Sequence, residues 1–155
     1  MALTKINNNT LSSAGIATGD ILQVVTATDS TNRSSTSTSF VTASNTLSVD
    51  ITPSSTSNKV LIIISQSIGR TNTQSLLDLN LLRGATSLFN PWGNDVLYTA
   101  VTQHNSGYAS INYLDSPSST SSTTYKTQFR SYDTNGVYAQ PSGSYSSITL
   151  IEIAG

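Results

Sequence analysis

The sequence contains no cysteine, one histidine and little charge of either sign. Only 10% of its 155 residues are Asp, Glu, Lys or Arg, and seven basic against eight acidic residues leave a formal net charge of −1. Without cysteine, disulfides, thiolate metal sites and thiol nucleophiles are excluded. Because there is no basic excess to neutralise phosphates, we expect no nucleic-acid binding and no association with an anionic membrane.

Long apolar runs are also missing. None approaches the roughly 18 residues of a membrane span, so we expect no membrane insertion. The first nine residues lack the apolar core of a signal peptide, and we expect no export sequence. The length is that of one domain with a single modest core.

What the sequence has is abundant Ser, Thr and Asn together with 36% hydrophobic residues. Thr, Val, Ile and Tyr suit pleated strands, whereas the residues that favour helices are scarce. The apolar pattern predicts strands over residues 21–27, 39–42, 47–51, 59–65, 76–83, 109–114, 124–132, 137–139 and 147–153. We therefore expect an all-β protein, an antiparallel β-sandwich of the jelly-roll type, over residues 20–155.

Three local patterns refine this expectation. The continuous apolar run 59–65 predicts a strand covered on both faces. Asn135-Gly136 predicts a tight hairpin turn before residues 137–139. The sequence Pro-Ser-Ser-Thr-Ser occurs at 53–57 and again at 117–121, which we interpret as one type of long turn used twice.

Residues 1–19 read as an arm outside the sandwich. Turn and flexibility signals alternate with scattered apolar residues, of which Leu3, Ile6 and Leu11 are candidate anchors. The segment is either a frayed end or a peptide that docks on a neighbouring subunit.

The search for chemistry finds no catalytic residues, cofactor site or metal site. His104 stands alone without a nucleophile motif, and the acids are dispersed rather than paired for glycan cleavage. No pattern matches a calcium loop, a zinc site or a phosphate-binding glycine loop. We therefore expect a protein that is not an enzyme, and a glycan-cleaving spike is the least favoured alternative.

Aromatic residues gather in the second half of the chain, where all seven tyrosines and the single tryptophan fall. Such side chains favour interfaces and sugar-binding surfaces. Two segments, 90–95 and 103–108, read as loops that could contact a receptor. The candidate contact residues are Trp92, Asn94, His104 and Tyr108.

The last strand is apolar on both faces, with Ile148 and Leu150 on one and Ile151 and Ile153 on the other. Two covered faces indicate subunit contact. Glu152 would then need a partner, for which Arg130 and Lys126 are candidates. The predicted subunit-contact residues are Arg130, Ile151, Glu152 and Ile153.

Several segments resemble virion structural proteins of tailed phages, a group often labelled tail fibre and common in marine and cyanobacterial phages. The matching segments are residues 47–62, Leu81-Leu82-Arg83-Gly84, residues 114–126 and the ending 146–155. The resemblance implies a homotrimeric jelly-roll β-sandwich on the exterior of the virion, made in the host cytoplasm. It carries no catalytic or cofactor residues to this chain.

The expected function is therefore a small trimeric fibre or appendage knob that contributes to host attachment. Its partners would be its own copies, other virion proteins through the arm, and a host surface glycan or protein. The alternative is a capsid decoration (cement) or head-fibre protein.

Overall fold

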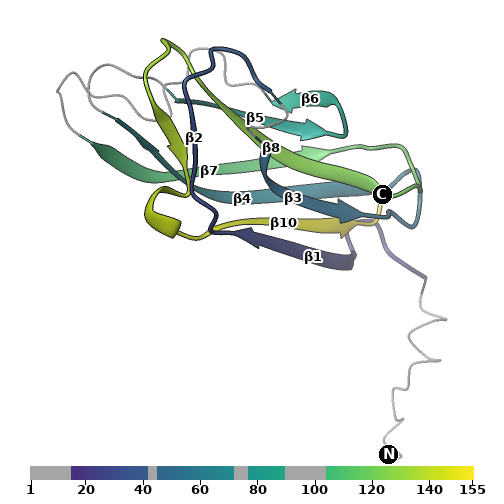
Figure 1. The fold of residues 1–155 in the computed structure, drawn as a ribbon. Coiled ribbons are helices and arrows are strands. Elements are labelled where there is room, and N and C mark those ends of the chain that lie inside the picture. The colour runs from purple at the N-terminus through teal and green to yellow at the C-terminus, as the bar shows by residue number, and fades with distance from the viewer. Residues whose placement is uncertain (1–14, 42–44, 72–76, 90–103) are drawn as a thin grey trace, which may run out of the picture.

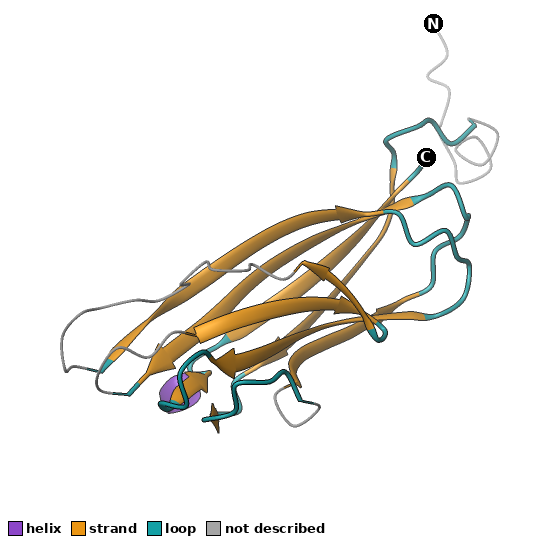
Figure 2. Cartoon of the chain, turned by 90° about the horizontal axis from the view of Figure 1, so that it is seen from above, coloured by secondary structure: helices purple, strands orange, loops and turns teal. Residues whose placement is uncertain are grey.

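The computed structural model describes residues 15–41, 45–71, 77–89 and 104–155. Figure 2 shows that strands form most of these residues, with one short helical turn, the 3₁₀ element η2 at Pro141–Gly143. The ten strands are β1 Ile21–Asp29, β2 Arg33–Ser35, β3 Asn45–Ile51, β4 Lys59–Arg70, β5 Leu77–Arg83, β6 Thr86–Phe89, β7 Asn105–Asp115, β8 Thr123–Ser131, β9 Val137–Ala139 and β10 Ser146–Ile153. Within the described ranges, no helix is long and apolar enough to cross a membrane.

The ten strands form two packed antiparallel sheets, one of six strands and one of four (Figure 1). The larger sheet has the order β1-β10-β4-β7, with the short β9 beside β4 and β2 beside β9, and the smaller sheet has the order β3-β8-β5-β6. The long strands β1, β4, β7 and β10 of the larger sheet interleave along the chain with the strands of the smaller sheet, and β10 inserts between β1 and β4, which is the arrangement of a jelly roll. The predicted all-β, jelly-roll-like sandwich is confirmed.

The core lies between the sheets and divides into two clusters along the strands. Strand alternation places one side of each strand inward. The cluster at the end where the chain terminates is built around Val60, Ile62, Leu81, Tyr125 and Leu150, and the other is built around Ile68, Leu79, Phe129, Val137 and Ala139. Each fully buried Val, Leu, Ile or Phe side chain in these clusters stabilises the fold by roughly 1.5–3 kcal/mol relative to an exposed one.

Strand β4 changes its partner strand along one edge. Residues 59–65 of β4 pair with β10, whereas residues 68–70 pair with β9. Along its other edge β4 pairs with β7 over residues 60–70. The short turn η2 joins β9 to β10 and lies at the place where the exchange occurs.

The two Pro-Ser-Ser-Thr-Ser segments both connect strands of opposite sheets. Residues 53–57 lead from β3 to β4, and residues 117–121 lead from β7 to β8. Because Val60 pairs with Asp115, both connections lie at one end of the sandwich, beside the C-terminus (Figure 1).

Two predicted elements are wrong. Residues 39–41 are not in a strand, because the Ser37 hydroxyl accepts from the Ser39 amide and donates to its carbonyl, replacing ladder bonds. A short strand, β2, lies instead over residues 33–35, where the sequence predicts no strand. The turn at Asn135-Gly136 does not make a hairpin, since β8 belongs to the smaller sheet and β9 to the larger.

Two further expectations fail at strands β4 and β7. Ile63 is exposed on the outer side of β4, so the run 59–65 is covered on one face only in the single chain. Residues 105–108, expected in a loop, form the start of β7, where they pair with the extended end of β4. Strand length depends here on the partner strand, which the local sequence does not reveal.

Candidate functional site

A polar groove lies on the outer face of the larger sheet. It consists of two adjoining hollows with volumes of about 390 and 370 Å³, which share Ser106, Pro141 and Ser142. The first hollow is also lined by Asn32, Gly69, Arg70, His104, Asn105 and Tyr138. The second is also lined by Ser67, Gly107, Tyr108 and Ser144. We call these two hollows the outer-face groove.

Strand register explains the floor of the groove. Ser67 pairs with Tyr108, and Gly69 pairs with Ser106 on one side and Tyr138 on the other. Directly paired residues point to the same face of a sheet, so these small side chains form a low floor between two tyrosines. A Cβ atom on Gly69 would lie 3.2 Å from Pro141 Cγ, so a side chain at this position would crowd the groove.

The wall of the groove is a strained turn over residues 140–144. Gln140 and Ser142 adopt left-handed backbone conformations, with φ of 51° and 57°. A non-glycine residue held in this way costs roughly 1–3 kcal/mol, and such strain gathers at functional sites. The turn is held to β4, because the Gln140 amide donates to the Ser67 carbonyl and the Ser144 hydroxyl lies 2.6 Å from Ser67 Oγ.

The chemistry of the lining is that of recognition. Asn, Ser and Tyr side chains supply both donors and acceptors. Arg70 is 1% exposed and pairs with the buried Val137, so its side chain lies on the inner face of the sheet and not on the groove. No carboxylate is present among the described residues that line the groove. Elsewhere in the described chain, no three His, Asp or Glu side chains gather into a group that could hold a metal ion.

The structure brings two of the predicted receptor-contact residues to this groove. His104 is exposed and lines the first hollow, and Tyr108, four residues further along the chain, lines the second. Trp92 and Asn94 lie outside the described residues, as do the predicted arm residues Leu3, Ile6 and Leu11. Sequence reasoning missed Tyr138 and the turn 140–144, which come from β9 and the segment after it.

A second feature of the outer face is an apolar band, which lies at the end of the sandwich where the C-terminus is found. Register aligns Val24, Ile151, Leu61 and Leu114 in one row across β1, β10, β4 and β7. Val24 is 55% exposed and Leu114 is 50% exposed. Ile63 and Ile153 lie on the same outer face of their strands, and we call these six residues the apolar band. The subunit-contact role assigned to Ile151 and Ile153 stays a prediction.

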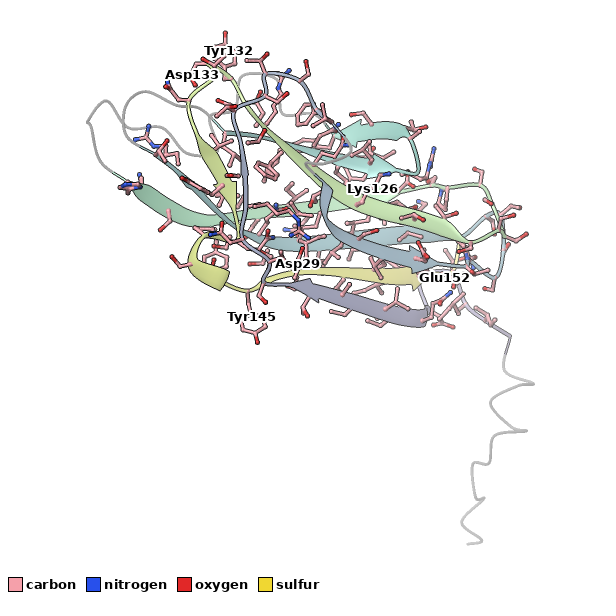
Figure 3. The ribbon with its side chains drawn as sticks, viewed as in Figure 1. Asp29, Lys126, Tyr132, Asp133, Tyr145 and Glu152 are labelled. Carbon is pink, nitrogen blue, oxygen red and sulfur yellow. The ribbon has the colours of Figure 1, made fainter. Side chains whose placement is uncertain are left out.

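Glu152, by contrast, points inward and is buried (Figure 3). Its carboxylate accepts hydrogen bonds from Gln23 Nε2 at 2.5 Å, from Asn58 Nδ2 at 2.5 Å, and from the amide and hydroxyl of Ser54 at 2.6 and 2.8 Å. Burial alone would raise the pKa of this carboxyl group, but the four donors outweigh burial and hold its pKa below the usual value.

The predicted partners of Glu152 are therefore wrong. Arg130 pairs with Asp78 at 2.8 Å and lies 4.8 Å from the centre of the Phe40 ring. Lys126 lies on β8 of the other sheet (Figure 3). Neutral donors from β1 and the 53–58 turn satisfy the carboxylate in place of a cation.

Comparison with known proteins finds no matching family description and no matching curated protein. Among solved structures, the chain is similar to a chain in the structure of infectious bursal disease virus, Gx strain, with a TM-score of 0.48 and 14% sequence identity. The alignment covers 86% of the present chain and 32% of the viral one, so this chain spans about a third of that neighbour's length.

Proposed function

We propose that this protein is a structural component of a phage virion, a small homotrimeric knob that contributes to attachment to the host surface. The apolar band carries the proposal. A row of apolar side chains across an outer sheet face, bordered here by the exposed Lys59 beside Ile153, is typical of a surface that another protein covers. Jelly rolls recur in viral coat proteins, and this analogy of fold agrees with the sequence resemblance of residues 47–62 and 146–155 to phage virion proteins.

A second copy of the chain is the occupant that we assign to the band. The six residues of the band are all uncharged, and the whole chain has a net charge of −1, so copies approach one another with little repulsion. Along β4 the band centres near Leu61 and the groove near Gly69, a separation of roughly 26 Å at 3.3 Å per residue. Contact through the band therefore leaves the groove open to solvent.

Placing a charge in the band is expected to dissociate the oligomer. Because Val24 is more than half exposed in the single chain, Val24→Asp should fold normally but bury a carboxylate against apolar side chains of a neighbour. Light scattering coupled to size exclusion should give three times 16.4 kDa for the wild type and a single chain mass for the variant.

Thr28→Asp is the matched control, since Thr28 is exposed on the same strand and the same face but lies outside the band. It should remain trimeric. A wild-type chain that is monomeric at tens of micromolar, or a Val24→Asp variant that stays trimeric, would remove the band from the subunit contact.

The virion role is tested separately by antibody labelling of phage particles viewed by negative-stain electron microscopy. Label at the tail or fibre tips is the expected result. Label spread over the head would instead identify a decoration protein. If neither intact nor disrupted particles are labelled, the virion role is wrong.

A further inference from the structure

We infer that the outer-face groove is a carbohydrate-binding site, an inference that deepens the proposed attachment function and rests on it. Among the described surfaces, this groove combines a hollow, polar lining and flanking aromatic side chains in one place.

The spacing of the two tyrosines suits linked sugar rings. Tyr108 and Tyr138 flank β4 on opposite sides, with Tyr108 opposite Ser67 and Tyr138 opposite Gly69. Two strand spacings across the sheet and two residues along it place their Cα atoms roughly 12 Å apart, about the length of two pyranose rings. Aromatic side chains with polar tips offer an apolar face to sugar C–H groups and a hydroxyl to their oxygens.

The polar groups of the groove match sugar hydroxyls, which both donate and accept. Asn32, Asn105, Ser106 and Ser142 each carry groups that can do the same. The Arg70 side chain is 1% exposed and lies on the inner face of the sheet, so the amides and hydroxyls of the lining carry the recognition, and they suit neutral sugars. The absence of Asp and Glu from the described lining disfavours a cationic ligand.

The wall is already ordered before a ligand arrives. The Gln140 side chain is fully buried beside the groove, with its amide nitrogen and oxygen making no hydrogen bond within the described residues, and its backbone is left-handed. The hydroxyl contact between Ser144 and Ser67 holds the turn against β4. A wall built in this way loses little freedom when a ligand binds.

A peptide that adds a strand does not fit this surface. Such binding needs an open sheet edge. The floor of the groove is strand β4, whose residue Gly69 is already paired with Ser106 on one side and Tyr138 on the other. The groove therefore offers side chains and a sheet face rather than free backbone groups.

The test uses the full-length protein on a printed array of neutral and uronic-acid-containing bacterial polysaccharides, followed by calorimetry with the polysaccharide bound best. Tyr108→Ala removes one of the two aromatic faces and should weaken binding about tenfold, which corresponds to about 1.4 kcal/mol. Tyr132→Ala is the control, because Tyr132 is 62% exposed and Tyr108 is 61% exposed, and Tyr132 does not line the groove. The control should bind within twofold of the wild type.

A second variant, Gly69→Val, fills the floor against Pro141 and should abolish binding, with its fold checked by circular dichroism. Binding of no polysaccharide, or wild-type binding by Tyr108→Ala and a folded Gly69→Val, would overturn the inference. Failure here is distinct from failure of the virion role. Carbohydrate binding without particle labelling overturns only the virion role, and labelling without carbohydrate binding overturns only the assignment of the groove.

Discussion

Replacing Glu152 by alanine is expected to lower the free energy of unfolding by about 3 kcal/mol. The side chain is buried, and its removal leaves the Gln23, Ser54 and Asn58 donors without their acceptor. An unsatisfied buried donor costs roughly 1–3 kcal/mol. Ser54 is exposed, so water partly satisfies its donors, and the total loss stays near the lower end of the summed costs of these donors. Urea unfolding followed by tryptophan fluorescence or circular dichroism measures this loss.

Asp50→Ala is the matched control, because it removes the same charge from an exposed site on β3. It should change stability by less than about 0.5 kcal/mol. Equal loss in both variants would mean that net charge, rather than the inward hydrogen bonds of Glu152, sets the effect.

The same carboxylate gives stability a defined dependence on pH. The folded pKa of Glu152 lies below its usual value of 4.5, so the folded state favours the charged form. Its contribution is complete above the unfolded pKa and is lost as pH falls through the folded pKa. Wild-type stability should therefore fall more steeply below about pH 4.5 than that of Glu152→Ala. Parallel curves for the two proteins would contradict the assigned role.

The sequence predicted the sandwich because its strands carry their own signal. Leu47, Val49 and Ile51 alternate with polar residues, and β3 follows that alternation. The composition, poor in helix-favouring residues, excluded helical packing before any strand was placed. The jelly roll itself is confirmed by the order of the strands in the two sheets. That order depends on contacts between residues distant in the sequence, which local patterns do not reveal.

The candidate site was harder to predict, because it too depends on contacts between residues that are distant in the sequence. His104 and Tyr108 were singled out as loop residues, but their place in one groove depends on the pairing of β7 with β4 and on the turn after β9. Glu152 was expected to meet a cation, whereas its four neutral donors come from positions about 94 to 129 residues away. No local pattern encodes such contacts.

A second buried acid ties the two sheets together at the same end of the sandwich. Asp115 ends β7 of the larger sheet and accepts from Arg83 Nη1 at 2.9 Å and from the Tyr125 hydroxyl at 2.6 Å, both on the smaller sheet. Burial, reinforced by the neighbouring carboxylate, raises the pKa of Tyr125, so its hydroxyl remains a donor at alkaline pH.

Asp115→Ala is expected to destabilise the fold by about 3 kcal/mol, because it leaves the fully buried Tyr125 hydroxyl unsatisfied and removes the partner of Arg83. Tyr125→Phe removes one hydrogen bond and should lower the free energy of unfolding by about 1 kcal/mol. The double variant Tyr125→Phe/Asp115→Ala should lose less than the sum of the two single losses, because the two residues share a hydrogen bond.

Glu152 and Asp115 both pair with Val60 from opposite sides, which places them roughly 10 Å apart with no shared donor. The double variant Glu152→Ala/Asp115→Ala should therefore lose the sum of the two single losses in urea unfolding. A markedly smaller loss would mean that the two carboxylates act as one network rather than as two separate ties.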